Sequence, residues 1–313
     1  MRFIDMHCDT LYKLYNNESE NLFNGDSSVN IEKLKKGGYS GQFFATFFEL
    51  ENVKSPFETA NLMIERFFKE VDENKNDISV ALSYNDFLKN DKNKKISAML
   101  TIEEGGAVEG KLENINYFYK KGVRLLGLTW NFENTLGYPH CFKENLPLKK
   151  FGKEAVDYMN HLGILVDVSH LSDKGFENVY EITKLNGVPF VASHSNARNL
   201  TNHSRNLTDE MIKKIGNSGG VIGLNFASHF LGESEEAKIA DMIKHLKYIR
   251  DKGGIDVLAF GTDFDGIDNE VELKDASYMI CLEDILSENG FSQNEIEKIM
   301  YKNVLRVVKD VLK

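Results

Sequence analysis

Residues 3–9 read FIDMHCD, a short apolar segment that ends in the pattern His-x-Asp. The segment is predicted to form a β-strand, in which residues two apart point to the same face. His7 and Asp9 would therefore present an imidazole nitrogen and a carboxylate on one side, while Cys8 would face the other way and pack. Such a pair suits a divalent metal ion of the zinc, manganese or cobalt kind. Its value depends on whether other strands also end in ligand residues.

Seven further apolar or β-branched segments follow the first, and amphipathic helical patterns lie between most of them. The eight strand candidates are residues 2–9, 41–49, 96–103, 123–130, 164–169, 189–193, 220–226 and 257–263, and the helical patterns are 57–73, 111–121, 150–162, 208–217, 236–252 and 293–312. Near-continuous hydrophobic strands alternating with helices predict a parallel sheet covered on both faces. We therefore predict an α/β fold, a (β/α)8 TIM-type barrel that forms a single metal-dependent hydrolase domain over residues 1–313.

Two points of this prediction stay open. Segment 41–49 can be read as a helix or as a strand, and the count of eight depends on it. A doubly wound open sheet is the alternative fold, although its dinucleotide-binding form lacks the expected GxGxxG after the first strand.

Composition and charge narrow the class of protein. The 313 residues carry a net charge of −10, which argues against a nucleic-acid partner. The three cysteines are far apart and form no CxxC, so neither a disulfide framework nor a thiolate zinc site is expected. The sequence shows no signal-peptide h-region, no run of 18 apolar residues and no anchor signal. We expect a soluble cytoplasmic protein without membrane contact, and leave a homodimer open.

Polar side chains follow five of the predicted strands. Barrel active sites lie at the C-terminal ends of the strands, so these residues are expected to meet. They are His7 and Asp9, Glu103 and Glu104, His170, His194, and finally Asp263 with Asp265. Together they predict a hydrolase centre with two metal ions, in which water is activated as a metal-bridging hydroxide.

Each ion needs its own ligands and a shared anionic bridge. His7 and Asp9 are expected to hold one ion, and His170 and His194 the other. Glu104 is the expected bridge, because Gly105 and Gly106 directly after it let the backbone turn sharply. We expect two Zn²⁺ per chain, with Mn²⁺ or Co²⁺ as alternatives.

The remaining polar residues near these strand ends receive other roles. Asp263 is expected to take the proton of the nucleophile and pass it to the leaving amine. Asp265 is expected to shape a turn, and Glu103 to be a neighbour of the site rather than a ligand. Asp167 could support a ligand imidazole or be a plain buried polar group.

The motifs as a set resemble the membrane (renal) dipeptidase family of zinc metallopeptidases, in the amidohydrolase-like superfamily of barrels. The matching stretches are Asp5 to Thr10, Glu104-Gly105-Gly106, Leu128-Thr129, Val166 to His170, Ser193-His194-Ser195, Arg205-Asn206 and Asp263 to Gly266. They follow the order of the family across the whole chain.

The resemblance implies a binuclear zinc dipeptidase that cleaves dipeptides with a free C-terminal carboxylate and tolerates a D-residue there. His7, Asp9 and Glu104 would match the ligands of one zinc, and Glu104, His170 and His194 those of the other. Asp263 would match the acid/base group. Arg205 would match the arginine that pairs with the carboxylate of the substrate, with Arg198 as the rival candidate.

The chain departs from the better-studied members of the family at two positions. Trp130 stands where they carry a substrate-contacting histidine after Leu-Thr, and Ala107 stands where they carry a histidine after Glu-Gly-Gly. Trp130 would offer a flat wall with one N–H donor, and His140 is a possible substitute for the missing histidine. Trp130 and Asn134 are therefore predicted to bind substrate.

Two other functions remain as alternatives. One is a different binuclear amidohydrolase that acts on a small amide, such as a deaminase or a cyclic-amide hydrolase; a carboxylated bridging lysine is common there, and a bridging glutamate argues against it. The other is a catalytically weakened metal-binding member, which only the loss at Trp130 favours.

Overall fold

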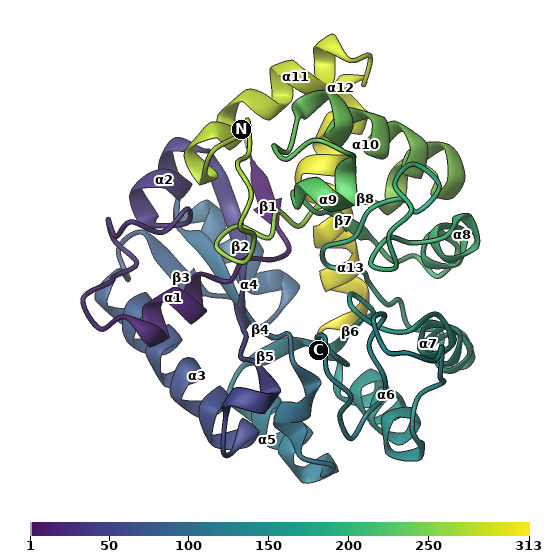
Figure 1. Cartoon of the computed structure of the whole chain (residues 1–313). Coiled ribbons are helices and arrows are strands. Elements are labelled where there is room, and N and C mark those ends of the chain that lie inside the picture. Colours follow the sequence, from purple (N-terminus) through teal and green to yellow (C-terminus); the bar gives the residue numbers. More distant parts are fainter. Residues whose placement is uncertain (1) are drawn as a thin grey trace.

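The apolar segments of the chain form the strands of one parallel sheet that curls into a barrel (Figure 1). The computed structural model describes residues 2–313. The strands are β1 Phe3–Asp5, β2 Tyr39–Thr46, β3 Ile78–Val80, β4 Ile96–Ile102, β5 Val123–Gly127, β6 Leu165–Asp167, β7 Ile222–Leu224 and β8 Leu258–Phe260. Their order is β6-β5-β4-β2-β1-β8-β7, with β3 added beside β4. The predicted fold class, a TIM-type (β/α)8 barrel, is confirmed, and residues 41–46 of the segment 41–49 lie in strand β2.

The segment predicted as the strand 189–193 closes the barrel without forming a regular strand. Val191 forms a bridge with Asp167 of β6, and Ala192 forms one with Ile222 of β7. One bridge on each side is too little for a ladder, and Pro189 at its start has no N–H to donate. The gap between β6 and β7 is nevertheless filled by this segment.

Helices surround the sheet, as Figure 1 shows. They are α1 Thr10–Asn16, α2 Ile31–Lys36, α3 Pro56–Glu73, α4 Tyr84–Lys92, α5 Leu112–Lys120, α6 Lys150–Leu162, α7 Asp173–Asn186, α8 Asp209–Asn217, α9 Ser228–Leu231, α10 Ile239–Gly253, α11 Leu282–Glu288, α12 Gln293–Glu297 and α13 Asn303–Val311. Local signals set their ends: α3 begins at Pro56, and the hydroxyl of Ser55 accepts a hydrogen bond from the backbone N–H of Glu58. The predicted helix 293–312 is interrupted by a wider turn at Lys298–Lys302.

Several elements, among them β3, α4 and α7, were not singled out in the sequence. β3 has only three residues, and α4 is mostly polar, with only Phe87 and Asn90 buried. Short or weakly amphipathic segments give little periodic signal. α4 and α7 complete the covering of the sheet.

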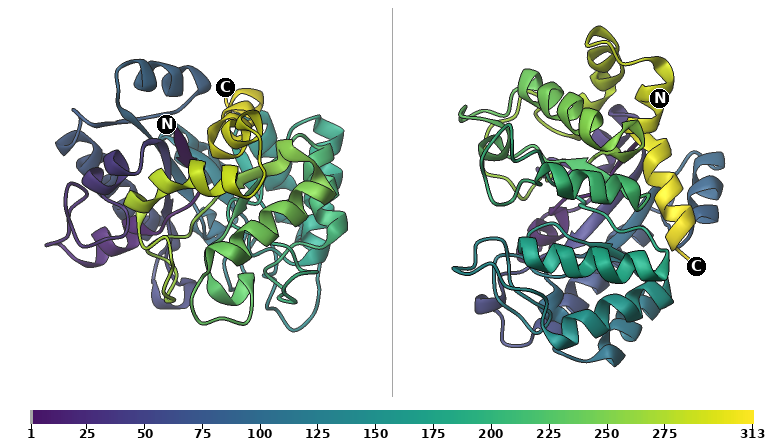
Figure 2. Two further views of the ribbon diagram at one scale, coloured as in Figure 1. Left: turned by 90° about the horizontal axis from the view of Figure 1, so that it is seen from above. Right: turned by 90° about the vertical axis from the view of Figure 1, so that its right-hand side faces the viewer.

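The amino end of the barrel is filled by apolar side chains. Ile4, Met99 and Leu165 from the strands form one buried cluster with Val307 and Val308 of α13. Figure 2 (left) shows α13, in yellow, and α4, in blue, on one side of the barrel, with most of the long connecting loops on the other. The two ends of the barrel therefore differ in composition.

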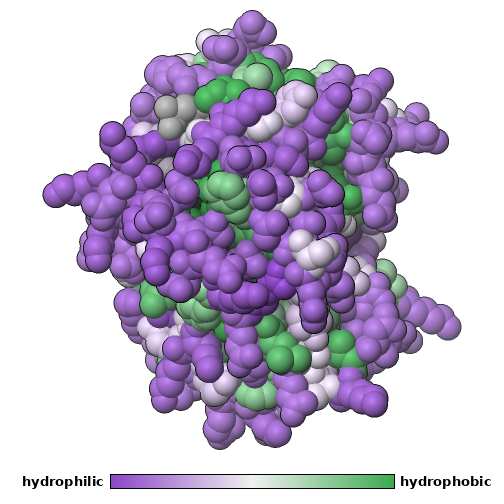
Figure 3. Space-filling view, turned by 90° about the vertical axis from the view of Figure 1, so that its left-hand side faces the viewer, coloured by the Kyte–Doolittle hydropathy of each residue, from purple (hydrophilic) through white to green (hydrophobic). Residues whose placement is uncertain are grey.

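At least one face of the outer surface is polar. Figure 3 shows one face that is mostly hydrophilic, with apolar side chains in small separate groups. No helix within residues 2–313 is long and apolar enough to cross a membrane.

Candidate metal centre and active site

The predicted strand ends at Asp5, before His7 and Asp9, but the loop after β1 still brings these two predicted ligands together. His7 Nε2 lies 3.3 Å from Asp9 Oδ2, and both side chains are buried. Asp5 fixes the end of this strand, because its carboxylate accepts hydrogen bonds from the backbone N–H of His7 and from the N–H and hydroxyl of Thr262. Cys8 faces away and is fully buried, in agreement with the prediction that it packs.

Glu103 stands between two groups of imidazoles. Its Oε2 lies 3.7 Å from His7 Nε2. Its Oε1 lies 3.1 Å from His170 Nε2 and 3.5 Å from His194 Nε2. Each oxygen of this one carboxylate therefore faces a different group of imidazole nitrogens.

The expectation that Glu104 forms the bridge requires correction. Its carboxylate accepts hydrogen bonds from the N–H groups of Gly106 at 2.5 Å and Trp130 at 2.8 Å, and from the Asn134 amide at 2.6 Å. It faces the loop after β5 and belongs to none of the clusters that could hold a metal among residues 2–313. The reason is the alternation of a strand: neighbouring side chains point to opposite faces.

That alternation was readable in the sequence of β4. Met99 packs inside the barrel, whereas Leu100 and Ile102 pack outside against the helices. Counting on in steps of two from Met99 leads to Glu103, not to Glu104. The glycines after Glu104 drew attention to the wrong carboxylate.

His194 is held by a buried carboxylate through a serine. Its Nδ1 lies 2.7 Å from the hydroxyl of Ser193, and that hydroxyl donates to Asp167 Oδ2 at 2.5 Å. The serine oxygen therefore accepts a hydrogen bond from the Nδ1–H of His194, and the lone pair of Nε2 points toward Glu103. Of the two roles left open for Asp167, the structure favours support of a ligand imidazole.

His170 is held by an amide that the sequence prediction missed. Its Nδ1 lies 2.9 Å from Asn131 Oδ1. The Nε2 atoms of His170 and His194 are only 2.9 Å apart. Nothing in the sequence singled out Asn131 except that it follows Trp130 in the same loop.

Three buried polar atoms at this centre have no hydrogen-bond partner within residues 2–313. They are His7 Nε2, Asp9 Oδ1 and Glu103 Oε2. An unpaired polar atom in a buried site is costly unless a ligand satisfies it. Three clusters of potential ligand residues include them, each with ligand atoms within 4.8 Å of one another: His7–Asp9–Glu103, Glu103–His170–His194 and His7–His194–Asp263. Imidazole nitrogens and carboxylate oxygens in this combination fit zinc and related divalent ions.

The crowded carboxylates of the site favour a positive charge among them. Burial lowers the pKa of His7, but the carboxylates of Glu103, Asp9 and Asp263 outweigh it and raise the pKa to about 10. Burial, followed by the charge of Asp9, raises the pKa of Glu103 well above its usual value. Without metal, a proton on His7 offsets part of the crowded negative charge, and a cation would take its place.

Asp263 follows β8 and faces the same cluster. Its Oδ1 lies 3.7 Å from His7 Nε2, and its Oδ2 accepts a hydrogen bond from Asn225 at 2.8 Å. Burial raises the pKa of Asp263 to about 6. Asp263 and His170 both adopt left-handed backbone angles, with φ of 64° and 66°. Such conformations cost about 1–3 kcal/mol each and persist where surrounding contacts enforce them.

Asp265 shapes the loop, as expected. Its carboxylate accepts hydrogen bonds from the Thr10 hydroxyl, from Lys13 and from the backbone N–H of Ser28. The loop after β8 is thereby tied to α1 and to the segment before α2.

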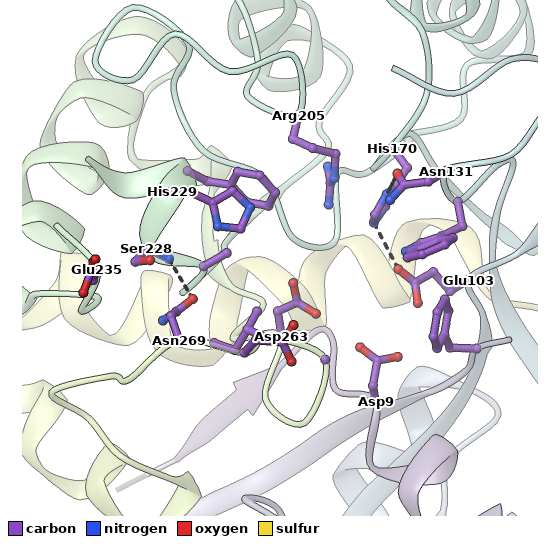
Figure 4. A pocket seen from close by; sticks show the side chains of 17 residues that line it. Asp9, Glu103, Asn131, His170, Arg205, Ser228, His229, Glu235, Asp263 and Asn269 are labelled. Atoms are coloured by element: carbon purple, nitrogen blue, oxygen red, sulfur yellow. Dashed lines mark hydrogen bonds and ion pairs between the residues drawn. The ribbon is translucent and has the colours of Figure 1, made fainter. Parts of the chain in front are cut away.

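The cluster opens into a cavity of about 680 Å³ that Figure 4 shows from close by. Several predicted site residues line it, namely Asp9, Trp130, His170, Arg205 and Asp263, and so does Glu103, which was not predicted as a site residue. Asn134, predicted to bind substrate, does not line it, since its amide is buried against Glu104 and the carbonyl of Leu128. His140 lies behind His170, with their ring centres 6.1 Å apart, and bonds to Ser204 and Asn131.

The two arginine candidates are placed differently. Arg205 is buried, lines the cavity, donates to the carbonyl of His194 at 3.1 Å, and has an Nε without a partner among residues 2–313. Burial lowers its pKa to about 10, so it stays charged at neutral pH. Arg198 instead forms a two-pronged ion pair with Asp173, at 2.7 and 2.8 Å. Arg205, and not Arg198, therefore presents a charged group at the wall of this cavity.

An aromatic wall borders the cavity beside the metal cluster. Trp130 packs edge-on against Phe47 with ring centres 4.8 Å apart, and its ring centre lies 6.1 Å from that of His170. Phe47 also lines the cavity and is only partly buried. The wall offers apolar contact at the position where the family resemblance implies a histidine.

Comparison with known proteins gives consistent results. A model of the membrane dipeptidase family (peptidase family M19) matches residues 1–313. An uncharacterised dipeptidase of Schizosaccharomyces pombe is 30% identical over 304 residues, which cover 90% of this chain and 72% of that protein. The crystal structure of dipeptidase AC, of family M19, has a TM-score of 0.91 and 26% identity, covering 100% of this chain and 99% of that one.

A metallopeptidase from Rhodobacter sphaeroides, solved with a phosphinate mimic of the dipeptide L-Ala-D-Ala, shares the fold. Its TM-score is 0.92 at 24% identity, covering 99% of both chains.

Proposed function

The chain belongs to the membrane dipeptidase family, peptidase family M19, and we propose that it is a dipeptidase with two divalent metal ions bridged by Glu103. One observation carries the proposal: the two oxygens of Glu103 face separate nitrogen ligands, His7 at 3.7 Å on one side and His170 at 3.1 Å on the other. A structural carboxylate would need only one such partner.

The ligand sets follow from this arrangement. His7, Asp9 and Glu103 would hold one ion, and Glu103, His170 and His194 the other. Zinc is the expected metal, since these donors are imidazoles and carboxylates. Two such ions would lower the pKa of a shared water to about 7 and polarise the scissile carbonyl.

Asp263 is placed to move the proton. Its carboxylate faces His7 and lines the cavity, and the amide of Asn225 orients its other oxygen. It would accept the proton released when water attacks the peptide carbonyl, and then donate it to the amine nitrogen as the C–N bond breaks. A carboxyl whose pKa burial raises to about 6 can hold a proton near neutral pH.

Arg205 and the aromatic wall would orient the dipeptide. The guanidinium of Arg205 would pair with the C-terminal carboxylate, because it is buried and charged at the cavity wall. The dipeptide mimic bound to the Rhodobacter sphaeroides protein has a C-terminal D-residue, which supports testing D-residues here. Trp130 and Phe47 would contact a side chain of the substrate.

Hydrolysis of Ala-Ala and Ala-D-Ala tests the proposal. The zinc-loaded protein is expected to release free alanine from both, to lose activity with a chelator, and to regain it when Zn²⁺ or Mn²⁺ is restored. An Asp263→Asn variant should keep its metal while kcat falls by about 100-fold or more. Absence of turnover with any dipeptide by protein that carries two ions would contradict the proposal.

A further inference from the structure

Asn131 accepts hydrogen bonds from two histidines with one oxygen. Its Oδ1 lies 2.9 Å from His170 Nδ1 and 3.1 Å from His140 Nε2. An amide oxygen can only accept, so both ring nitrogens must carry their protons. His170 Nε2 is then left with a lone pair, directed toward Glu103 Oε1 at 3.1 Å.

The opposite orientation of the amide does not fit the site. If the NH₂ group of Asn131 faced His170, the imidazole proton would sit on Nε2. There it would meet His194 Nε2 at 2.9 Å, on the side where a cation must bind. The tautomer that Asn131 selects is therefore the one that ligates metal.

The two histidines of this ion site are held by unequal partners. His194 is backed by the carboxylate of Asp167 through Ser193, with both contacts at 2.7 Å or less. His170 is backed only by a neutral amide, and its own backbone is in the left-handed region. Its imidazole thus depends more on a single contact for its orientation.

Hydrogen bonds also fix the residues on either side of the contact between Asn131 and His170. The backbone N–H of Trp130 donates to Glu104 at 2.8 Å, which anchors the neighbouring residue. His140 bonds to Asn131 through Nε2, and its Nδ1 accepts from the hydroxyl of Ser204 at 2.7 Å. Ser204 directly precedes Arg205, so the amide connects a metal ligand to the loop that carries the arginine.

We propose that Asn131 is a positioning residue. By accepting the Nδ1–H of His170, it orients this imidazole toward the ion that Glu103, His170 and His194 would hold. The inference rests on the proposed two-ion function but concerns metal affinity rather than substrate.

Zinc titration of the whole protein against a competing chelator tests the proposal. Wild-type protein is expected to bind two Zn²⁺. Asn131→Leu, which removes the acceptor, should weaken the binding of one of the two ions by about 10–100-fold and leave the affinity for the other unchanged. Asn131→Asp, which keeps the acceptor and adds charge, should bind both ions at least as tightly as wild type.

Asn134→Leu is the matched control. Asn134 lies in the same loop and also holds a buried contact, but to Glu104 and not to an imidazole. It should lower the melting temperature while both ions bind with wild-type affinity. Equal zinc affinities for Asn131→Leu and wild type would overturn the proposal, as would weaker binding by Asn131→Asp. Should the leucine variant not fold, the aspartate variant alone decides.

Failure of this inference and failure of the proposed function are distinguishable. Dipeptide hydrolysis with an unchanged zinc titration in Asn131→Leu would remove only the role of Asn131. Two-ion binding that depends on Asn131, without any dipeptide hydrolysis, would remove only the proposed function. Binding of a single Zn²⁺ by wild type would overturn the positioning role together with the two-ion centre.

Discussion

The same strands form both ends of the barrel, but the two ends bury different kinds of side chain. At the amino end, Ile4 and Leu165 pack with Val308 of α13 in a buried hydrophobic cluster. At the carboxyl end, Glu103, Asp9 and Asp263 crowd around buried imidazoles, and several of their atoms lack partners among residues 2–313. One end stabilises the fold, whereas the other is stable only to the extent that the rest of the molecule and a bound cation offset it.

The largest expected effect comes from the carboxylate at the centre of the carboxyl end. Glu103→Gln should lower kcat/KM by about 1000-fold or more, because each cation loses an anionic ligand. The same change removes like-charge crowding, so the metal-free variant should melt at a higher temperature than metal-free wild type. Steady-state assays measure kcat/KM, and thermal unfolding in the presence of a chelator measures the melting temperatures of the metal-free proteins.

Glu104→Gln serves as the control for that variant. It should bind two ions and lose less activity, since its carboxylate holds a loop and not a metal. Wild-type activity in Glu103→Gln, or greater loss of metal in Glu104→Gln, would reverse the assignment of the two glutamates.

The next effect concerns the arginine at the wall of the cavity. Arg205→Gln should reduce kcat/KM for dipeptides by about 100-fold, mainly through KM, because a charge-assisted contact to the substrate carboxylate is lost. Arg198→Gln should change kcat/KM by no more than about twofold, because its pair with Asp173 is partly exposed. Equal effects of the two substitutions would contradict the role of Arg205.

A smaller effect is the pH dependence of metal binding. In metal-free protein the pKa of His7 is about 10, so the imidazole is protonated at pH 7 and must release that proton to bind a cation. Zinc affinity should therefore rise by about tenfold per pH unit between pH 7 and pH 9. Calorimetry in buffers of different ionisation enthalpy would show the release of protons, and binding without proton release would exclude a charged His7.

The smallest effect on activity, and a clear one on stability, is expected at the amino end. Val308→Ala removes buried methyl groups and should lower the free energy of unfolding by about 2 kcal/mol. Because α13 lies at the end of the barrel away from the metal cluster, kcat/KM should stay within about twofold of wild type. A large loss of activity in a folded Val308→Ala protein would show that the two ends are not independent.

The sequence predicted the barrel well because its strands are buried on both sides and read as continuous apolar segments. It failed where the signal is short or non-periodic, at β3 and in the polar helix α4. The segment around Val191 shows the reverse case, since its apolar composition predicted a strand that the structure reduces to two bridges.

At the site, the sequence predicted residues that end strands but not the direction in which each one points. His7, Asp9, His170, His194 and Asp263 meet because the ends of parallel strands meet. Glu103 and Glu104 are adjacent and chemically identical, so only the alternation along β4 separates them. Asn131 lies in a loop without periodicity, and its contact with His170 depends on tertiary structure.

Anomalous diffraction at the zinc edge, on crystals of the zinc-loaded protein, tests the central claim most directly. The account predicts two peaks about 3.5–4 Å apart, with Oε2 of Glu103 bound to the ion beside His7 and Oε1 bound to the ion beside His170 and His194. A single peak, or a peak bound by Glu104, would contradict it.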